Sequence, residues 1–258
     1  MRGFMKRVCC WLVTVAMLAA SASYARTLAE IQAKGALSLC ANPDALPFAS
    51  AKAEPPGFQI EVARALAHGL GVALEMQWIL PRMRANLVNC DMLMDSIDDA
   101  ALYEGRLLLS HPYQRTGVAL VVGPQTTVIN GFEGIAKGQK VGVMVGSAAQ
   151  VVLGKRGVAA SPYAFEQDML DDLTQGALYG VAASPATIGY YMQQHPEAKL
   201  RLVHAYDREP QLAWSVAVGM RKADQALVDA VNAVLDQLLS DGTIAKIYSR
   251  YGVEHRSP

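Results

Sequence analysis

The order of apolar, strand-like segments and amphipathic, helix-like segments restricts the fold of this chain more than any other feature. The segments "ALSLC" at 36–40 and "VALEMQW" at 72–78 are typical of buried strands. Between them, "PGFQIEVARALAHGLG" places four apolar residues on one helical face: Phe58, Val62, Leu66 and Leu70. Because strands and helices that alternate in this way form a sheet covered by helices, we predict an α/β fold with mostly parallel strands.

The alternation continues as two series. A helix near Arg82 to Asn89 and a strand from Asp91 end the first series. The second series contains the predicted strands "KVGVMV", "LYGVAA" and "LRLVHA" and the predicted helices "SAAQVVLGKRG", "EQDMLDDLTQG" and "SPATIGYYMQQ". Near the C-terminus, a long apolar stripe around 227–238 and the segment "GTIAKIYSRYG" predict two final helices.

Two apolar, extended segments border the second series, Thr116 to Val122 and Leu212 to Met220. Neither has a Pro/Ser-rich linker beside it, so we interpret them as crossings between two lobes. Lobe 1 would comprise residues 26–117 and, after the return crossing, 212–258, whereas lobe 2 would comprise 118–211. Ligands bind where the carboxyl ends of strands meet, so the cleft between the lobes is the expected binding place.

The N-terminus has the order of a secretory signal peptide. Three basic residues in the first seven positions precede an uncharged run from Val8 to Leu18 and small residues that end at Ala25. The run is shorter than the roughly 18 residues of a membrane span, so we expect a cleaved signal peptide over 1–25 and export to the periplasm. Without those three residues, 20 basic residues remain against 23 acidic ones, a charge of about −3. This mildly acidic balance argues against a nucleic-acid partner. We also expect a monomer.

Cys40 and Cys90 are the only cysteines downstream of the signal peptide. In an oxidising compartment we expect them to form one disulfide, with two separate buried thiols as the alternative. The five histidines show no metal-ligand spacing, and neither a nucleophile elbow nor a phosphate loop occurs. The sequence therefore predicts no metal, no cofactor and no catalytic residue.

Polar residues stand where several of the predicted strands end. Asp95 directly follows the apolar run Met92 to Met94, and a carboxylate there needs hydrogen bonds, an ion pair or an open cleft. Asp98 could instead be the N-cap of a helix running to Glu104. Ser147 begins a predicted helix and either caps it or, with the free backbone N–H groups there, holds an anion. Phe48 either stacks on a ligand or fills the core of its lobe.

Six segments in this order resemble the periplasmic solute-binding proteins of family 3, best known as polar amino-acid receptors of ABC importers. They are "LPF" at 46–48, "GFQIEVARALAHGLG", "CDMLMDSI", "LSHPY", "VGVMVGSAA" and "MRKADQALVDAVNAVLDQLLSDGTIAKIYSRYG". The resemblance implies a type II two-lobed fold without catalytic activity, a small-molecule ligand in the cleft and a permease as a partner. It also puts the loop after "CDMLMDSI" at the mouth of the cleft. The expected contacts with a ligand or partner are therefore Phe48, Asp95, Ser96, Asp98, Tyr103, Tyr113, Ser147 and Ser184.

Two departures from the family pattern concern charge. The arginine that grips the ligand carboxylate in amino-acid receptors corresponds to Tyr103, and the aspartate that precedes the Ser-Pro of a lobe 2 helix corresponds to Ala183. A pocket without both charges has lost the groups that recognise a zwitterion, so we predict that ordinary amino acids do not bind. Arg106 or Arg115 could supply a substitute charge from nearby.

A smaller branch of the family, the J-type accessory proteins (MxaJ/XoxJ type) encoded with periplasmic quinoprotein alcohol dehydrogenases, is similar at Cys40, Pro47-Phe48 and Cys90-Asp91. This similarity implies a non-enzymatic accessory protein whose partner is a quinoprotein dehydrogenase or its cytochrome c, met by an acidic and aromatic cleft rim. The first alternative is an importer receptor for a small polar, cationic or apolar solute. The second is a dehydratase-like enzyme, which would need a general acid and the arginine that Tyr103 replaces.

Overall fold

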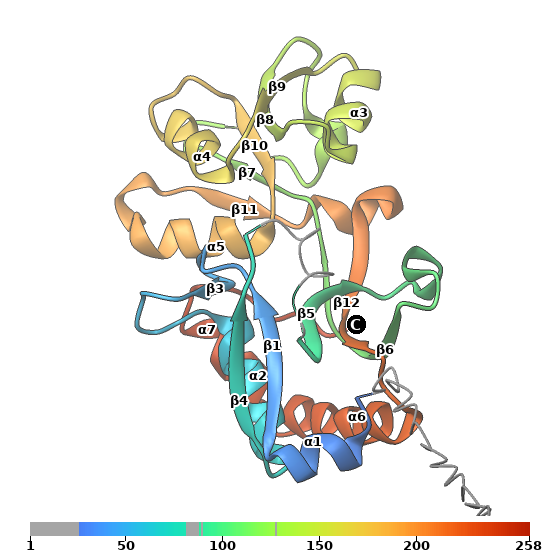
Figure 1. Cartoon of the computed structure of the whole chain (residues 1–258). Coiled ribbons are helices and arrows are strands. Elements are labelled where there is room, and N and C mark those ends of the chain that lie inside the picture. The colour runs from blue at the N-terminus through green and yellow to red at the C-terminus, as the bar shows by residue number, and fades with distance from the viewer. Residues whose placement is uncertain (1–25, 81–87, 89, 127) are drawn as a thin grey trace, which may run out of the picture.

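The structure, a computed structural model, describes residues 26–80, 88, 90–126 and 128–258. It contains two α/β lobes, each built around a five-stranded sheet (Figure 1). Lobe 1 holds the beginning and the end of the described chain, and lobe 2 holds the middle. The two-lobed α/β fold predicted from the alternation of strands and helices is therefore confirmed.

The sheet of lobe 1 has the strand order β4-β1-β5-β12-β6. Its strands are β1 (Ala36–Ala41), β4 (Ala73–Trp78), β5 (Met92–Ile97), β6 (Leu107–Gly117) and β12 (Ala213–Arg221). Its helices are α1 (Leu28–Lys34), α2 (Phe58–Gly69), α6 (Gln225–Ser240), α7 (Thr243–Ser249) and the short helix η2 (Ala100–Tyr103). A two-stranded pair, β2 (Asp44–Ala45) and β3 (Ala49–Ser50), lies between β1 and α2 in the chain.

The sheet of lobe 2 has the strand order β11-β7-β10-β8-β9. Its strands are β7 (Ala119–Val122), β8 (Lys140–Met144), β9 (Ala159–Tyr163), β10 (Gly180–Ala183) and β11 (Arg201–Val203). Its helices are α3 (Ala148–Lys155), α4 (Glu166–Thr174) and α5 (Pro185–Gln194), with the short helices η3 (Phe132–Gly134), η4 (Pro196–Ala198), η5 (Ala205–Arg208) and η6 (Pro210–Leu212).

Both sheets are mostly parallel, as predicted, because in each sheet four strands run in one direction and one crossing strand runs against them. In lobe 1, β1 runs parallel to β4 and β5, and β12 runs antiparallel to β5 and β6. In lobe 2, β8 runs parallel to β9 and β10, and β7 runs antiparallel to β10 and β11. The reason is that β7 and β12 enter their lobes from the other lobe, so they start at the side where the parallel strands end.

The chain passes between the lobes at two adjacent points. The first lies between β6 and β7, and the second lies between η6 and β12. Ala213 pairs with Gly117 in the antiparallel register of β12 and β6. The Val118 N–H donates to the Leu212 carbonyl at 2.9 Å. Backbone pairing therefore holds the two crossings together.

Two sequence predictions need comment. The helix expected near Arg82 to Asn89 falls on residues that, apart from Val88, lie outside the described part of the chain. Strand β9 was not predicted, because "AASPY" lacks an apolar alternation and contains a proline, which sheets tolerate at their edges; β9 is an edge strand. In the described ranges, no helix is long and apolar enough to cross a membrane.

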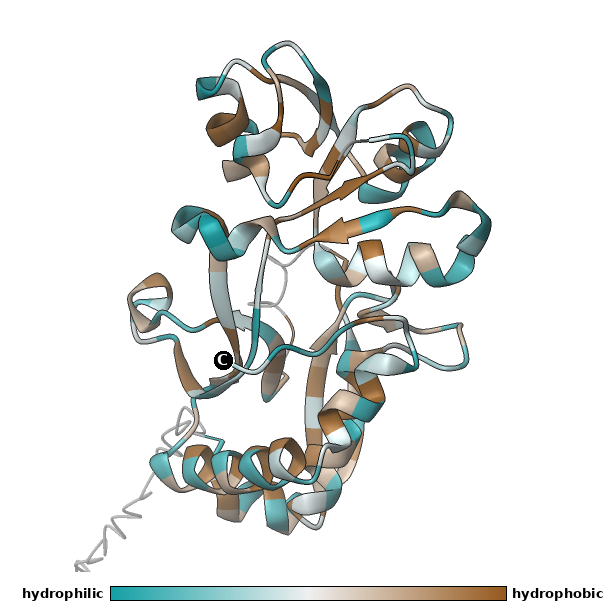
Figure 2. Cartoon of the chain, turned by 180° about the vertical axis from the view of Figure 1, so that it is seen from behind, coloured by the Kyte–Doolittle hydropathy of each residue, from teal (hydrophilic) through white to brown (hydrophobic). Residues whose placement is uncertain are grey.

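Each lobe has its own hydrophobic core. In lobe 2, the hydrophobic residues are concentrated on the strands (Figure 2). In lobe 1, the Phe58 ring lies 4.3 Å from the Tyr248 ring and 6.2 Å from the Tyr251 ring, between centroids. These contacts join α2 to α7 and to the turn that follows α7, and aromatic pairs of this kind add stability beyond their buried area.

Candidate functional site

A disulfide joins Cys40, near the end of β1, to Cys90, just before β5. The bond confirms the predicted pairing. Strands β1 and β5 are neighbours in the sheet, with Leu39 paired to Met92, so the disulfide reinforces an existing contact. Cys40 also forms part of the wall of a pocket on lobe 1.

The lobe 1 pocket encloses about 290 Å³ beyond the ends of β1 and β4 and beside β5. Its larger apolar wall residues are Phe48, Ile79, Leu80 and Leu93. Its polar wall residues are Asn42, Gln59 and Asp95. Apolar walls with a few polar groups are typical of small-molecule sites, in which the polar groups orient the ligand.

Phe48 lies in this pocket because the start of α2 fixes its backbone. The Gln59 N–H donates to the Phe48 carbonyl at 3.0 Å, and the two phenylalanine rings of Phe48 and Phe58 lie 5.1 Å apart. Gly57 has a φ of +113°, and a Cβ there would come within 2.4 Å of the Phe48 carbonyl oxygen. Phe48 therefore packs on the core and lines the pocket at the same time.

Asp95 and Ser96 are neighbours in β5 and face opposite sides of the sheet. Asp95 is exposed and lines the lobe 1 pocket. Ser96 is 0% exposed, and its Oγ lies close to Gly219 of β12, where a Cβ would come within 2.2 Å. Ser96 is thus enclosed by the sheet, so the prediction that it contacts a ligand or partner is wrong.

The acidic turn after β5 differs from the prediction in its cap. Asp99, not Asp98, caps the short helix η2 and accepts a hydrogen bond from the Ala101 N–H at 3.1 Å. Asp98 is exposed, and its backbone N–H donates to the Ser215 carbonyl at 2.9 Å. Asp98 does not line the lobe 1 pocket, and its proposed contact with a partner stays a prediction.

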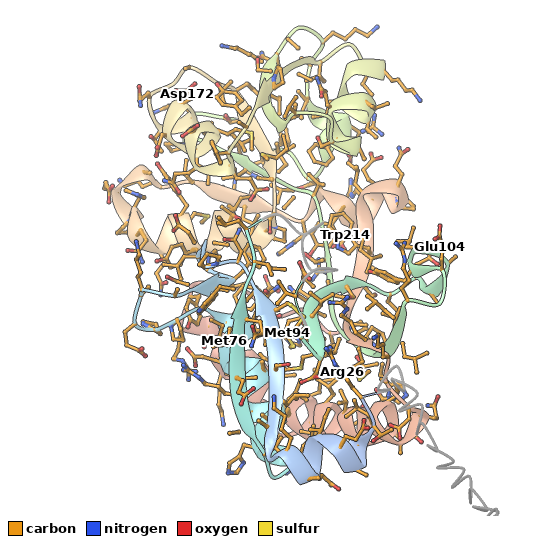
Figure 3. All side chains as sticks on the ribbon, viewed as in Figure 1. Arg26, Met76, Met94, Glu104, Asp172 and Trp214 are labelled. Carbon is orange, nitrogen blue, oxygen red and sulfur yellow. A yellow bond between two sulfur atoms is a disulfide. The ribbon has the colours of Figure 1, made fainter. Side chains whose placement is uncertain are left out.

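Tyr103 ends η2 half-buried, and its carbonyl accepts bonds from the backbone N–H of Arg106 at 2.8 Å and from its Nε at 3.1 Å. Figure 3 shows that the next residue, Glu104, projects from the opposite side of lobe 1 to Met76 of β4. Arg115 pairs with Asp207 at 3.5 Å. Tyr103 and both arginines lie outside the walls of the two candidate pockets, so neither arginine supplies the missing charge there.

Tyr113 is a core residue, and the prediction that it lines the cleft is wrong. Its side chain is 1% exposed, and its hydroxyl donates to the Met94 carbonyl. Burial, reinforced by the negative charge of Asp95, raises the pKa of the Tyr113 hydroxyl well above its usual value. Because strand side chains alternate between faces, this position of β6 points into the lobe 1 core.

The lobe 2 pocket encloses about 150 Å³ and includes both predicted serines. Ser147 caps α3 and accepts a bond from the Gln150 N–H at 3.3 Å. Ser184 caps α5 and accepts a bond from the Ala186 N–H at 3.3 Å. Both hydroxyls therefore serve as helix caps while they line the pocket.

Two further residues of this pocket, Glu166 and Trp214, were missed at the sequence level. Glu166 begins α4, and its Oε1 accepts a hydrogen bond from the Ser184 N–H at 2.8 Å. Trp214 follows the return crossing and lies at the junction of the lobes (Figure 3). The only sequence signals were a carboxylate after a strand and one of the chain's three tryptophans in a crossing segment.

The two pockets supply carboxylates, hydroxyls, amides and aromatic faces, which can orient and hold a small molecule. Among their described wall residues there is no lysine, arginine or histidine. In the described part of the chain, no three His, Cys, Asp or Glu side chains cluster in a way that could hold a metal ion.

Comparisons with known proteins agree with this architecture. A probable amino-acid ABC transporter-binding protein of Haemophilus influenzae is 26% identical over 74% of this chain and 74% of its own length. A probable histidine-binding protein of Neisseria gonorrhoeae is 23% identical over 83% of this chain and 81% of its own length.

Two solved structures are similar in fold. The unliganded, open L-cystine solute receptor of N. gonorrhoeae has a TM-score of 0.74 at 20% identity and covers 90% of this chain and 99% of its own. An ancestral cationic amino acid solute-binding protein has a TM-score of 0.74 at 23% identity and covers 87% of this chain and 98% of its own. The family model of bacterial extracellular solute-binding proteins, family 3, matches residues 37–254. The chain therefore belongs to the bacterial extracellular solute-binding proteins of family 3.

Proposed function

We propose that this protein is a periplasmic receptor that binds a small solute between its lobes and delivers it to the permease of an ABC importer. The observation that carries the proposal is a pair of pockets, one on each lobe, of about 290 and 150 Å³. The wall of the lobe 2 pocket includes Gly117, Val118 and Trp214 from the crossings, so that pocket lies at the hinge. The curated relatives named as amino-acid and histidine-binding proteins favour this role over the accessory role.

The geometry supports binding by lobe closure. The crossings stay paired through the bond from Val118 to Leu212, so rotation there can change the lobe angle without opening either sheet. A solute that touches both pockets makes more contacts in a closed form and thereby shifts the population toward it. The dehydratase alternative would need an arginine in the site, and none occurs among the described wall residues of either pocket.

The first test asks whether binding uses both lobes. The mature protein is purified gently from native periplasm, and any small molecule released on denaturation is identified by mass spectrometry. Titration of that molecule should show at least a tenfold loss of affinity in Phe48→Ala and in Trp214→Ala. The control Val128→Ala changes a residue that is 81% exposed and should bind normally. Binding that depends on only one of the two aromatic residues would contradict a site shared between the lobes.

The accessory role in a quinoprotein dehydrogenase system is the second candidate, because the Cys40–Cys90 disulfide forms in the wall of the lobe 1 pocket. Its expected acidic and aromatic rim is smaller than predicted, since Tyr113 is buried. The same periplasmic preparation discriminates the candidates. A dehydrogenase or its cytochrome c that co-purifies at low salt and dissociates as salt rises favours the accessory role. A protein that arrives alone with a small molecule favours the receptor.

A further inference from the structure

We infer that Glu166 and Trp214 form a subsite in lobe 2 for an organic ammonium group with apolar substituents. The inference rests on the proposed receptor function and names the chemistry of one end of the solute. It begins from the charge in the lobe 2 pocket, where Glu166 is the one ionisable side chain among the described wall residues.

One oxygen of the Glu166 carboxylate is held by a hydrogen bond, and the other oxygen can still contact a ligand. Its Oε1 accepts the 2.8 Å bond from the Ser184 N–H, which orients the carboxylate toward the start of α5. In the described part of the chain, no basic side chain forms an ion pair with Glu166, and its Oε2 accepts no hydrogen bond. A half-buried carboxylate without a cationic partner attracts a positive charge from a ligand more strongly than a fully solvated one does.

Trp214 adds an aromatic face to the same pocket. It is half-buried and pairs with Thr116 in the register of β12 and β6, so both crossing strands support it. The faces of aromatic rings attract organic cations, and tryptophan does so most strongly. A carboxylate and an indole in one pocket therefore favour a cation over a neutral group of the same shape.

The other walls indicate the substituents on that cation. They include Met144 and three small side chains, Ala149, Ala182 and Ala183, while the hydroxyls of Ser147 and Ser184 already accept bonds as helix caps. Apolar walls fit methyl or methylene groups better than the N–H groups of a bare ammonium ion. A volume of about 150 Å³ matches that of a cavity known to hold benzene, which leaves room for a trimethylammonium group.

The experiment uses choline as the probe and 3,3-dimethylbutan-1-ol, in which carbon replaces the charged nitrogen, as its neutral isostere. Titration calorimetry on the mature protein should give choline at least a tenfold lower Kd than the isostere. Glu166→Gln keeps an acceptor for the Ser184 N–H but removes the charge, and should reduce choline affinity at least tenfold. The variant Trp214→Leu should also reduce the affinity for choline. The control Glu197→Gln, at an exposed carboxylate of lobe 2, should bind like the wild type.

Two further measurements, on the variant Glu166→Asp and on the native small molecule, distinguish the possible outcomes. Glu166→Asp keeps the charge and withdraws it by one methylene group, so it should bind choline more weakly and still prefer choline to the isostere. Equal binding of choline and the isostere, full affinity in Glu166→Gln, or no choline binding overturns the subsite. If the native small molecule still needs Phe48 and Trp214 but not the charge of Glu166, the receptor function stands and the ammonium subsite fails.

Discussion

Removing the Cys40–Cys90 disulfide should destabilise lobe 1 strongly. The bond joins cysteines 50 residues apart, so it closes a loop that contains α2 and β4. On the chain-entropy model, a loop of that length stabilises the folded chain by about 4 kcal/mol, because the crosslink restricts the unfolded ensemble. For a chain of this size, that loss lowers Tm by about 8 to 16 °C.

The assay compares three samples of the mature protein: oxidised wild type, wild type with reductant, and the double variant Cys40→Ala, Cys90→Ala. Urea unfolding followed by tryptophan fluorescence reports on Trp78, which ends β4, and on Trp214 at the crossing. Reductant should lower the wild-type midpoint and leave the double variant unchanged. Cys40 also lines the lobe 1 pocket, so the double variant should bind the native solute more weakly.

Titration of the cysteine thiols provides the control for this experiment. Denatured, unreduced wild type should contain no titratable thiol, because both mature cysteines are in the bond. Two reactive thiols per chain would show that the bond does not form. If no free thiol is found, yet reductant leaves the unfolding midpoint unchanged, the loop-closure reasoning fails, because the disulfide would not be restricting the unfolded chain.

The remaining predictions concern the hinge and the C-terminal segment. Arg256→Ala removes a 2.8 Å ion pair with Asp207 and should cost about 1 kcal/mol in urea unfolding. Gly117→Ala places a Cβ within 2.3 Å of the Leu212 carbonyl oxygen, so it should cost about 1 to 3 kcal/mol and change the lobe angle measured by small-angle scattering. Burial lowers the pKa of His255, so the folded state favours neutral imidazole. The stability that His255 contributes as a neutral imidazole is therefore fully present above the unfolded pKa of about 6.5 and is lost as the pH falls below that value. Urea unfolding midpoints measured between pH 7.5 and 5.5 test this.

A matched control variant for each substitution separates its specific effect on stability from the nonspecific effect of changing a residue. Arg208→Ala breaks an exposed ion pair with Glu133 and should cost less than about 0.5 kcal/mol, so an equal loss would contradict the reasoning for Arg256. Gly123→Ala places its Cβ where no atom lies within 4 Å and should be harmless. The variant His255→Gln should make the urea unfolding midpoint less dependent on pH between 7.5 and 5.5. The variant His68→Gln, at an exposed position, should leave the pH dependence as it is in the wild type.

Much of the fold could be predicted because local patterns encode it. The apolar spacing from Phe58 to Leu70 corresponds to α2, and the segment "VALEMQW" corresponds to β4. Ser147 and Ser184 were identifiable as helix starts because serine satisfies the free N–H groups of a first turn. The disulfide was predictable because the mature chain offers only one pair of cysteines.

The facing of strand residues could not be predicted. Asp95 and Ser96 are adjacent, so one of them had to face each side of β5, and only the pairing with β12 decides which. In the structure Ser96 lies against Gly219, and Asp95 lines the pocket. Tyr113 illustrates the same limit, because an aromatic residue with a hydroxyl suits a pocket and a core equally well.

Short-range patterns in the chain account for the alternation of strands and helices and for the two crossings, because hydrophobic periodicity and helix caps act between residues that are close in sequence. The disulfide follows because the mature chain offers a single pair of cysteines. Two features depend on the folded chain as a whole: the crossing strands enter their sheets antiparallel, and Glu166 accepts a bond from the Ser184 N–H across 18 residues of chain. These contacts depend on how α4 and α5 pack beside β10 and on where the chain returns from the other lobe. No local pattern carries that information, because it arises from long-range packing of complete elements.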